Sequence, residues 1–428
     1  MKLGFVPVLD PTGGGIYQYC ASVAHALREL GSTGGTVALL APGSELPPMM
    51  KGWAYLELPV LSPPDPQTPR LPCVKSQRLR SGLRMIRRRV QRRSMADFDR
   101  IPARPETARL LRDNAIDLTL FPAPRAVSFE IGLPYVMAIH DLQHRLQPEF
   151  PEVSANGAWD SREHLFRNGA RYASVVLADS EVGREDILDA YSRYGLDEER
   201  VCILPFVVPP ELEATAAAAD QAAARIRHRY ALPERYLFYP AQFWPHKNHL
   251  RLVEALGILR RRDLRITLVL AGSWSGTLRE QTFEKMMSLA LSLNVDEQLT
   301  VLGYVPDSDM AGLYRGAAAL VFPTFFGPTN LPIIEAWALG CPVVTSDIRG
   351  IREQVGDAAL LADPREPEAL AEAIEQVWTD DELGRRLVAH GRARVAAFSP
   401  EDFRRRLTEI LDRAVELGPP DVMRERAT

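Results

Sequence analysis

The stretch FFGPTNLPIIEAWALGCPVV, residues 325–344, contains one complete unit of an α/β protein. Its Gly-Pro-Thr-Asn turn leads into an eight-residue apolar run, and Pro332 suits the first turn of a helix. Gly340 ends the run, and Pro-Val-Val then begins a strand. The stretch therefore predicts a turn, a buried helix and a strand. Glu335 is its one carboxylate, and we expect it in the first helical turn.

The same alternation of strand and helix extends over most of the chain. Apolar runs predict strands at residues 2–8, 36–40, 117–121, 135–139, 174–178 and 201–204. A second series is predicted at residues 236–239, 266–271, 299–302, 319–322, 342–345 and 359–361. Helical spacing is found in most of the intervals, including residues 248–260, 279–293, 307–316 and 366–379. This order is typical of parallel, doubly wound sheets with helices on both faces.

The chain divides into two Rossmann-like domains. Its 428 residues exceed what one hydrophobic core usually serves. Residues 211–231, which include an alanine run, interrupt the strand alternation, so we expect one domain at 1–212 and a second at 213–399. A last helix at 400–417 opens with a Ser-Pro-Glu start signal. Ligands of such sheets bind at the carboxyl ends of the strands, so the two domains predict a cleft between them.

Composition narrows the setting and the partners. The net charge of −4 gives no reason to expect a nucleic acid partner. The four cysteines lie far apart and form no metal-ligand pattern, which favours a reduced, cytoplasmic protein. The first residues run directly into a strand pattern without a signal peptide, and no window reaches 18 apolar residues.

Two stretches can bind phosphate. Residues 12–15, Thr-Gly-Gly-Gly, lie between the first strand and the first helix, where bare backbone can approach an anion. A tight turn explains the glycines equally well, and Gln18 stands where the dinucleotide fingerprint needs its last glycine. In YPAQFWPHKNHLRLVEAL, residues 239–256, Lys247 precedes a helix and provides a cation beside a helix N-terminus. A solvated lysine is the alternative, but the rigid Trp-Pro-His before it favours phosphate.

Two further side chains stand at predicted functional edges. An ionised Glu335 at the positive end of its helix can accept hydrogen bonds from ribose hydroxyls, or it can simply cap the helix. His140 ends the apolar strand at 135–139, the edge at which α/β sheets present functional groups. His144 follows at a spacing that suits zinc only on a helix, and the pattern H-E-x-x-H is absent, so we expect no metal.

The run KSQRLRSGLRMIRRRVQRR, residues 75–93, is basic and has apolar residues at helical spacing. Such a helix can lie on an anionic membrane or contact an acidic acceptor. A solvated surface helix or loop is the alternative. The membrane hypothesis would place the protein at the inner face of the membrane.

Taken in order, GGG near the N-terminus, IHDLQH, YPAQFWPHKNH, VLGYVPDSDMAGLYRGAAALVFPT and GPTNLPIIEAWALGCPVV resemble the retaining nucleotide-sugar glycosyltransferases of family four. This resemblance spans nearly the whole chain. It implies the GT-B fold, in which two Rossmann-like domains face each other across a cleft, with an acceptor-binding domain at 1–212 and a donor-binding domain at 213–399. It also implies transfer of a mannose-like or glucose-like hexose from a nucleotide-diphosphate sugar to a saccharide or lipid-linked acceptor, with retention of configuration and without metal or cofactor.

The resemblance also implies roles for single residues. His140 and Lys247 would act in catalysis, His140 at the donor sugar and Lys247 at the diphosphate. Glu335 would bind the ribose hydroxyls. The remaining residues expected to bind the donor are Gly13, Gly14, Gly15, Gln242, Gly303, Tyr304, Val305, Thr329, Asn330 and Leu331.

Two positions depart from the pattern of the family. Gly327 stands where relatives have the first of two glutamates, and Gln242 stands where many have an arginine that accompanies the lysine. These departures leave two alternatives open besides the transferase. One is a non-catalytic, sugar-nucleotide-binding partner of a transferase, and the other is a GT-B epimerase that acts on sugar nucleotides.

Overall fold

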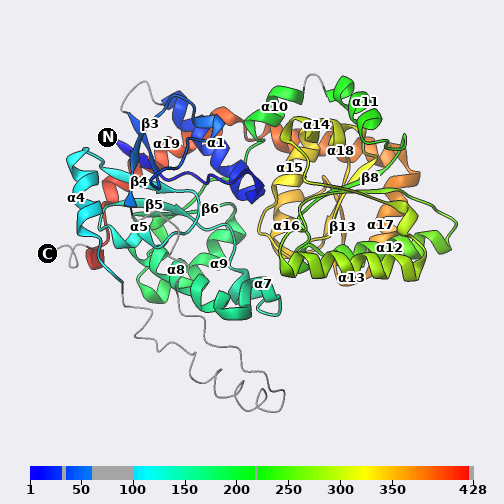
Figure 1. Cartoon of the computed structure of the whole chain (residues 1–428), viewed down its shortest axis with the longest axis horizontal. Helices are drawn as coiled ribbons and strands as arrows, with labels where there is room; N and C mark the ends of the chain where they lie inside the picture. The colour runs from blue at the N-terminus through cyan, green and yellow to red at the C-terminus, as the bar shows by residue number, and fades with distance from the viewer. Residues whose placement is uncertain (31–34, 60–100, 217–218, 424–428) are drawn as a thin grey trace, which may run out of the picture.

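The molecule has two halves, and a parallel β-sheet forms the centre of each (Figure 1). The computed structural model describes residues 1–30, 35–59, 101–216 and 219–423. The basic run at 75–93, and with it the hypothesis of membrane contact, lies outside the described residues. Within the described part of the chain, no helix combines the length and the apolar character needed to cross a membrane.

The first sheet has the strand order β3-β2-β1-β4-β5-β6-β7, and its neighbours pair in parallel. Its strands are β1 (Leu3–Phe5), β2 (Thr36–Leu40), β3 (Ala54–Glu57), β4 (Leu118–Phe121), β5 (Tyr135–Ala138), β6 (Val175–Ala178) and β7 (Val201–Ile203). The helices of this half are α1 (Gly15–Leu30), α4 (Pro105–Asp113), α5 (Val127–Glu130), α6 (Gln143–Leu146), α7 (Pro151–Ser154), α8 (Ala158–Tyr172) and α9 (Glu181–Tyr191). The order reverses between β1 and β4, which opens a crevice there.

The second sheet repeats the arrangement with the order β10-β9-β8-β11-β12-β13. Its strands are β8 (Leu237–Pro240), β9 (Leu268–Ala271), β10 (Leu299–Gly303), β11 (Ala319–Phe322), β12 (Val343–Ser346) and β13 (Leu360–Ala362). Its helices are α12 (His249–Arg261), α13 (Thr277–Leu293), α14 (Asp307–Gly316), α15 (Leu331–Ala338), α16 (Arg349–Val355), α17 (Pro367–Thr379) and α18 (Asp381–Ala396). Here the order reverses between β8 and β11.

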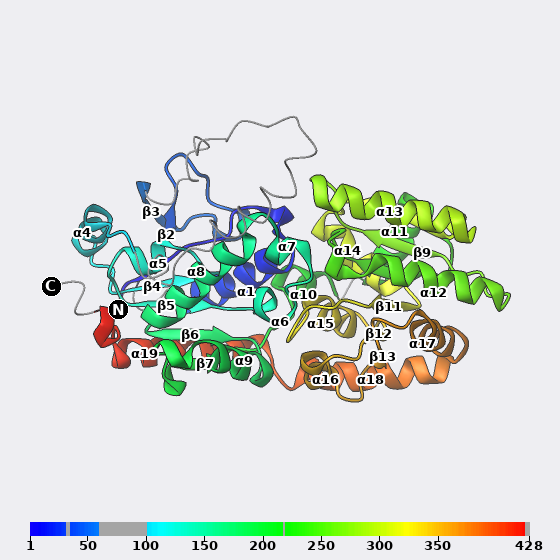
Figure 2. The ribbon, with the colours of Figure 1, turned by 90° about the horizontal axis from the view of Figure 1, so that it is seen from below.

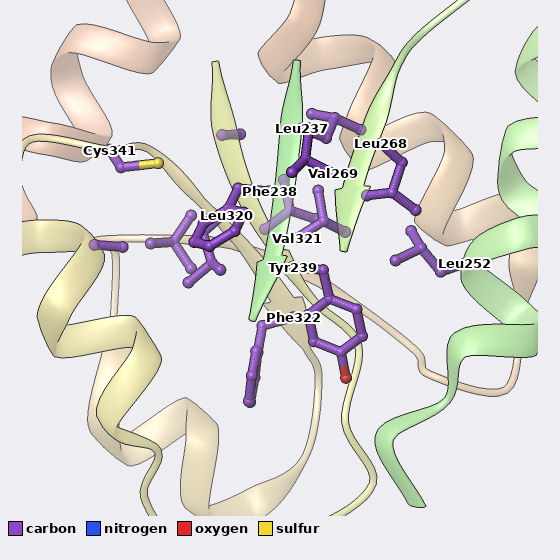
Figure 3. Packing of buried hydrophobic residues seen from close by; sticks show 14 of the residues in the cluster. Leu237, Phe238, Tyr239, Leu252, Leu268, Val269, Leu320, Val321, Phe322 and Cys341 are labelled. Carbon is purple, nitrogen blue, oxygen red and sulfur yellow. The ribbon is translucent and has the colours of Figure 1, made fainter. Parts of the chain in front are cut away.

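The central strands are apolar except for Thr119 of β4, because helices cover both faces of each sheet. All residues of β4, β5, β6, β9 and β11 are buried. Figure 3 shows part of the second core, with Leu320 and Val321 of β11 near Phe238 and Tyr239 of β8. Full burial of one such side chain stabilises the fold by about 1.5–3 kcal/mol.

The link between the sheets is helical. The helices α10 (Pro210–Ala216) and α11 (Ala219–Arg229) lie between β7 and β8 in the chain, and both pack against α14 of the second half. The predicted division after residue 212 falls within α10. The last helix, α19 (Pro400–Leu417), returns to the first half, as Figure 2 shows along its lower edge. Its apolar face, with Phe403, Leu407 and Ile410, is buried in the same cluster as β1 and α1.

The fold class and the positions of most strands agree with the sequence prediction, while some elements were missed. The strand β3 was not predicted because three of its four side chains are exposed and it lacks an apolar pattern. The helix α18 was also missed, since only Gly384, Leu387 and Gly391 of its sixteen residues are buried. Both elements lie at the margin of the fold, where the hydrophobic pattern is weakest.

Side chains from both halves bond across the interface. The carboxylate of Glu353 in α16 accepts hydrogen bonds from the backbone N–H groups of Glu181 and Val182, each at 2.9 Å. Next to it, Arg349 pairs with Asp186 at 2.6 Å. These contacts join α16 to the first turn of α9, whose free N–H groups favour a negative partner.

Candidate active site

One pocket lies between the two halves and is lined by loops that follow strand ends. Seven of the predicted site residues line it, namely Gly14, Gly15, Gln242, Tyr304, Val305, Leu331 and Glu335. Other lining residues include Gln18, Glu211, Ser273 and Asp307. His140, Lys247, Gly13, Gly303, Thr329 and Asn330 are not among the residues that line this pocket. The pocket therefore brings together seven of the predicted residues and leaves six outside its lining.

The glycine turn brings bare backbone close to the second half. The helix α1 begins at Gly15, and a Cβ atom at that position would lie 3.7 Å from the Leu331 side chain of α15. Gln18, which breaks the dinucleotide fingerprint, donates from Nε2 to Asp307 across the pocket at 3.1 Å. The N–H of Gly13 is already bonded to the carbonyl of Asp10 at 3.0 Å. The N-terminus of α1 thus opens at the cleft, as a phosphate site requires.

Lys247 ends a short 3-10 turn, Pro245–Lys247, just before α12. Its carbonyl accepts from the Tyr239 hydroxyl at 2.5 Å, and its ammonium lies 5.0 Å above the ring of Phe322. Burial lowers the pKa of Lys247 to about 8, although the charges of Asp141 and Glu152 oppose this. The side chain therefore remains largely protonated at neutral pH and is a half-buried cation beside the ring of Phe322.

His140 uses both ring nitrogens within the protein. Nδ1 lies 3.0 Å from the carboxylate of Asp179, and Nε2 lies 2.8 Å from the carbonyl of Pro122. Burial lowers the pKa of His140, but the charge and hydrogen bond of Asp179, together with the carbonyl of Pro122 and the charge of Asp141, outweigh burial, and the net pKa is raised. Two acceptors favour a ring that is protonated on both nitrogens. A sugar contact from either nitrogen would have to displace one of these hydrogen bonds.

The prediction that Glu335 lies in the first helical turn and stays ionised is wrong. Because α15 begins at Leu331, Glu335 is its fifth residue and lies beyond the free N–H groups of the first turn. Burial raises the pKa of Glu335 to about 7, although a 2.5 Å hydrogen bond from the Tyr314 hydroxyl opposes the shift. At neutral pH the carboxyl is therefore divided between its two protonation states. It does line the pocket, as a hydroxyl-binding residue must.

The turn at residues 327–330 contacts protein on several sides. Gly327 has φ +137°, and a Cβ atom there would lie 2.3 Å from Nδ2 of Asn330. Asn330 donates its backbone N–H to Gln354 at 2.9 Å, so that group is not offered to a ligand. The Thr329 hydroxyl donates to Asp179, the partner of His140, at 3.4 Å. The positive φ and the close contact with Asn330 both disfavour a side chain at position 327, where the family resemblance predicts a glutamate.

Gln242 holds an arginine at the edge of the pocket. Its side-chain oxygen accepts from the indole N–H of Trp244 at 2.9 Å and from Nη1 of Arg279 at 2.8 Å. The guanidinium of Arg279 lies 4.8 Å from the centre of the Trp244 ring. A cation thus remains next to the position at which many relatives have an arginine of their own.

Sequence reasoning missed several residues that shape the site. Asp179 directly follows β6, so the rule that polar groups at strand ends are functional could have found it. Glu211 and Asp307 add acidic groups to the pocket, and burial, together with Asp307, raises the pKa of Glu211. No sequence pattern indicates Glu152, because its hydrogen-bond partner His246 lies 94 residues further along the chain.

Comparison with known proteins agrees with this geometry. The family model described as glycosyl transferases, group 1, matches residues 220–394. The O-antigen chain mannosyltransferase B of Escherichia coli is 30% identical over 274 residues, which are 62% of this chain and 67% of that protein. The chain belongs to this family. It is a member of family four of the glycosyltransferases, as the motifs predicted.

A second relative and two solved structures extend the comparison. The serotype-specific mannosyltransferase WbdA of Escherichia coli is 27% identical over 60% of this chain, but the match spans only 31% of WbdA. A glycosyltransferase from Rickettsia africae has a TM-score of 0.65 at 17% identity, with 97% of this chain and 98% of that chain covered. HepE of Anabaena in complex with UDP-glucose has a TM-score of 0.65 at 16% identity, with 96% and 99% covered. The predicted GT-B fold is confirmed.

The raised pKa of Glu335 predicts how stability changes with pH. The carboxyl loses its proton near pH 4.5 when unfolded but near pH 7 when folded, so the folded state holds the proton more tightly. The contribution of the Glu335 carboxyl to the free energy of unfolding is fully present below about pH 4.5 and is lost as the pH rises through about 7. Urea unfolding at several pH values should show the wild type losing stability relative to Glu335→Gln over this window. A constant difference between the two proteins would contradict the assignment.

The geometry of Gly327 predicts that a restored glutamate does not fit. Both the positive φ and the contact with Asn330 oppose any side chain, so Gly327→Ala and Gly327→Glu should lower the free energy of unfolding. Gly276→Ala is the control, because Gly276 also has a positive φ, +104°, but its nearest neighbour is the flexible end of Arg279 at 3.4 Å. We expect Gly276→Ala to lower the free energy of unfolding by about 1–3 kcal/mol, and the changes at Gly327 to lower it further. A Gly327→Glu variant as stable as the wild type would contradict this interpretation of the turn.

Proposed function

We propose that the protein is a hexosyltransferase that moves a hexose from a nucleotide-diphosphate sugar to a saccharide or lipid-linked acceptor, with retention of configuration. The observation that carries this proposal is the pocket in which Gly14 and Gly15 of one half face Leu331 and Glu335 of the other. The backbone at the start of α1 can receive phosphate oxygens. On the opposite wall, Glu335 can accept hydrogen bonds from the ribose hydroxyls, most strongly when ionised.

The charges suit departure of a nucleoside diphosphate. Breaking the bond between the anomeric carbon and the phosphate leaves negative charge on the leaving group. Lys247 and the N–H groups at the start of α1 can stabilise that charge where it develops. Because Lys247 is half-buried beside Phe322, part of its desolvation is complete before the substrate binds. Exclusion of water between the two halves would protect the donor from hydrolysis.

The relatives favour a mannose donor and a saccharide acceptor for this chain. O-antigen chain mannosyltransferase B and WbdA are named as mannosyltransferases, whereas the HepE structure contains UDP-glucose, so a glucose donor is the alternative. We propose that the reaction needs no metal and no cofactor, because the leaving-group charge has protein partners. We also propose that the protein acts in the cytoplasm, and that the basic run 75–93 brings it to the inner face of the membrane.

The role of Lys247 can be measured directly. Lys247→Ala should lower turnover by about 10²-fold or more, the usual effect of losing one electrostatic contact in the transition state. Turnover is measured as release of nucleoside diphosphate from GDP-mannose and UDP-glucose with a panel of saccharide acceptors. Lys285→Ala is the control, because this lysine is exposed on α13. An unchanged rate for Lys247→Ala would refute the assignment of the phosphate site.

The stereochemical prediction needs only the product. We expect the new glycosidic bond to have the anomeric configuration of the donor sugar, which the NMR coupling constant of the anomeric proton reports. Inversion would overturn the proposal of retention while leaving hexose transfer intact. Release of an epimerised sugar without an acceptor would instead support the epimerase.

A further inference from the structure

Glu152 of the first half is bonded to the loop that carries Lys247 in the second half. One carboxylate oxygen, Oε1, accepts hydrogen bonds from the backbone N–H of His246 at 3.0 Å and from its ring Nδ1 at 2.6 Å. The two side chains are only 7% and 11% exposed. A buried carboxylate that receives two donors from one residue fixes both the backbone and the ring of that residue.

Aromatic packing reinforces this contact from both halves. The ring of His246 stacks on Phe326, with centroids 3.8 Å apart and planes inclined by 6°. Phe150, two residues before Glu152, packs against Phe325 at 5.3 Å and Phe326 at 5.2 Å. The backbone N–H of Phe325 also donates to the carbonyl of His246 at 2.9 Å. The loop is therefore held between α7 of the first half and the turn after β11 of the second.

The contact bears directly on Lys247, the next residue in the chain. The 3-10 turn that contains both residues ends at Asn248, whose side chain donates to the carbonyls of Pro323 at 3.0 Å and Pro364 at 2.7 Å. Asn248 has φ +63°, so the turn has little freedom on that side. On the other side, the hydrogen bonds to Glu152 restrain His246 from outside its own half. The backbone that leads into Lys247 is consequently restrained from the opposite half as well as from its own.

We propose that Glu152 is a positioning residue that holds His246 from across the cleft, so that Lys247 takes its phosphate-binding geometry only when the two halves are closed. This inference rests on the proposed function, because it assigns Lys247 to the donor diphosphate. In this arrangement the α7 segment links closure of the cleft to the geometry of the phosphate site. Of the two neutral tautomers of the His246 ring, the one protonated at Nδ1 can donate to the carboxylate.

Glu353 provides a matched control for this proposal. It is also a carboxylate that accepts two hydrogen bonds across the interface, at Glu181 and Val182, but it contacts α9 and not the Lys247 loop. If Glu152 merely helped to hold the halves together, removing either carboxylate would have a similar effect. If it positions Lys247, only the change at Glu152 should weaken the binding of a nucleoside diphosphate.

The experiment is a double-mutant cycle on ligand affinity, measured by titration calorimetry on the full chain with UDP and GDP as probes. Glu152→Ala should weaken binding about tenfold or more, since small displacements of a binding group have effects of this size or larger. Glu353→Ala should stay within about threefold of the wild type, and Glu152→Ala should add less than about threefold in a Lys247→Ala background. Glu152→Gln, whose side-chain oxygen can still accept from His246, should recover most of the affinity.

Several results would overturn the inference. The first is an equal loss of nucleoside diphosphate affinity in Glu152→Ala and Glu353→Ala. The second is an unchanged affinity in Glu152→Ala. The third is that Glu152→Ala weakens binding as much in the Lys247→Ala background as it does in the wild type. If Glu152→Ala does not fold, His246→Phe replaces it, because phenylalanine keeps the stack on Phe326 and loses the ring N–H. A wild type that binds neither UDP nor GDP would refute the proposed function and this inference with it, whereas binding without coupling refutes only the inference.

Discussion

The reversal of strand order at the centre of each sheet is the constraint on which the site depends. Between β1 and β4, and again between β8 and β11, neighbouring strands send their connections to opposite faces of the sheet. The loops at the carboxyl ends of these strands diverge and leave a crevice. In the first half the crevice exposes the glycine turn before α1, and in the second it exposes the loops before α12 and α15. The pocket exists because these two edges face each other.

The acidic residues of the site line the shared pocket, whereas the cation of Lys247 lies outside its lining. Glu211, Asp307 and Glu335 line the shared pocket, and burial raises the pKa of Glu211 and of Glu335. Lys247 lies outside that lining and keeps a proton at neutral pH despite burial, since its pKa is about 8. An anionic ligand would therefore favour the side of Lys247, while hydroxyl and N–H donors would favour the carboxylates. A nucleotide diphosphate has both kinds of group, which is why the division suits it.

Sequence patterns predicted the parts of this molecule that depend on local order. Continuous apolar runs identified the central strands, and Pro332 with Gly340 bounded α15, because both signals act within a few residues. The environment of Glu335 was not predictable, since its protonation depends on Tyr314 in another helix and on the burial of both groups. The two hydrogen bonds of His140 involve Pro122 and Asp179, which are distant in sequence. Contacts between residues that are distant in sequence produce no periodic pattern, so a single sequence does not predict them.

The turn at Gly327 illustrates how a family motif can change its role without loss of structure. Where relatives have a glutamate, the backbone here takes a conformation open to glycine, and the following Pro328 lies between two other glycines. A Cβ atom at Gly350 would be 2.4 Å from Pro328, and one at Gly183 in the first half would be 3.4 Å from it. Thr329 then reaches Asp179, so the turn is bonded to the residue that holds His140. The segment thus contributes to the interface and stabilises the orientation of His140 from the opposite half. A glycine at 327 suits this arrangement, because a Cβ atom there would lie 2.3 Å from Nδ2 of Asn330 and 3.3 Å from the carbonyl of Thr329.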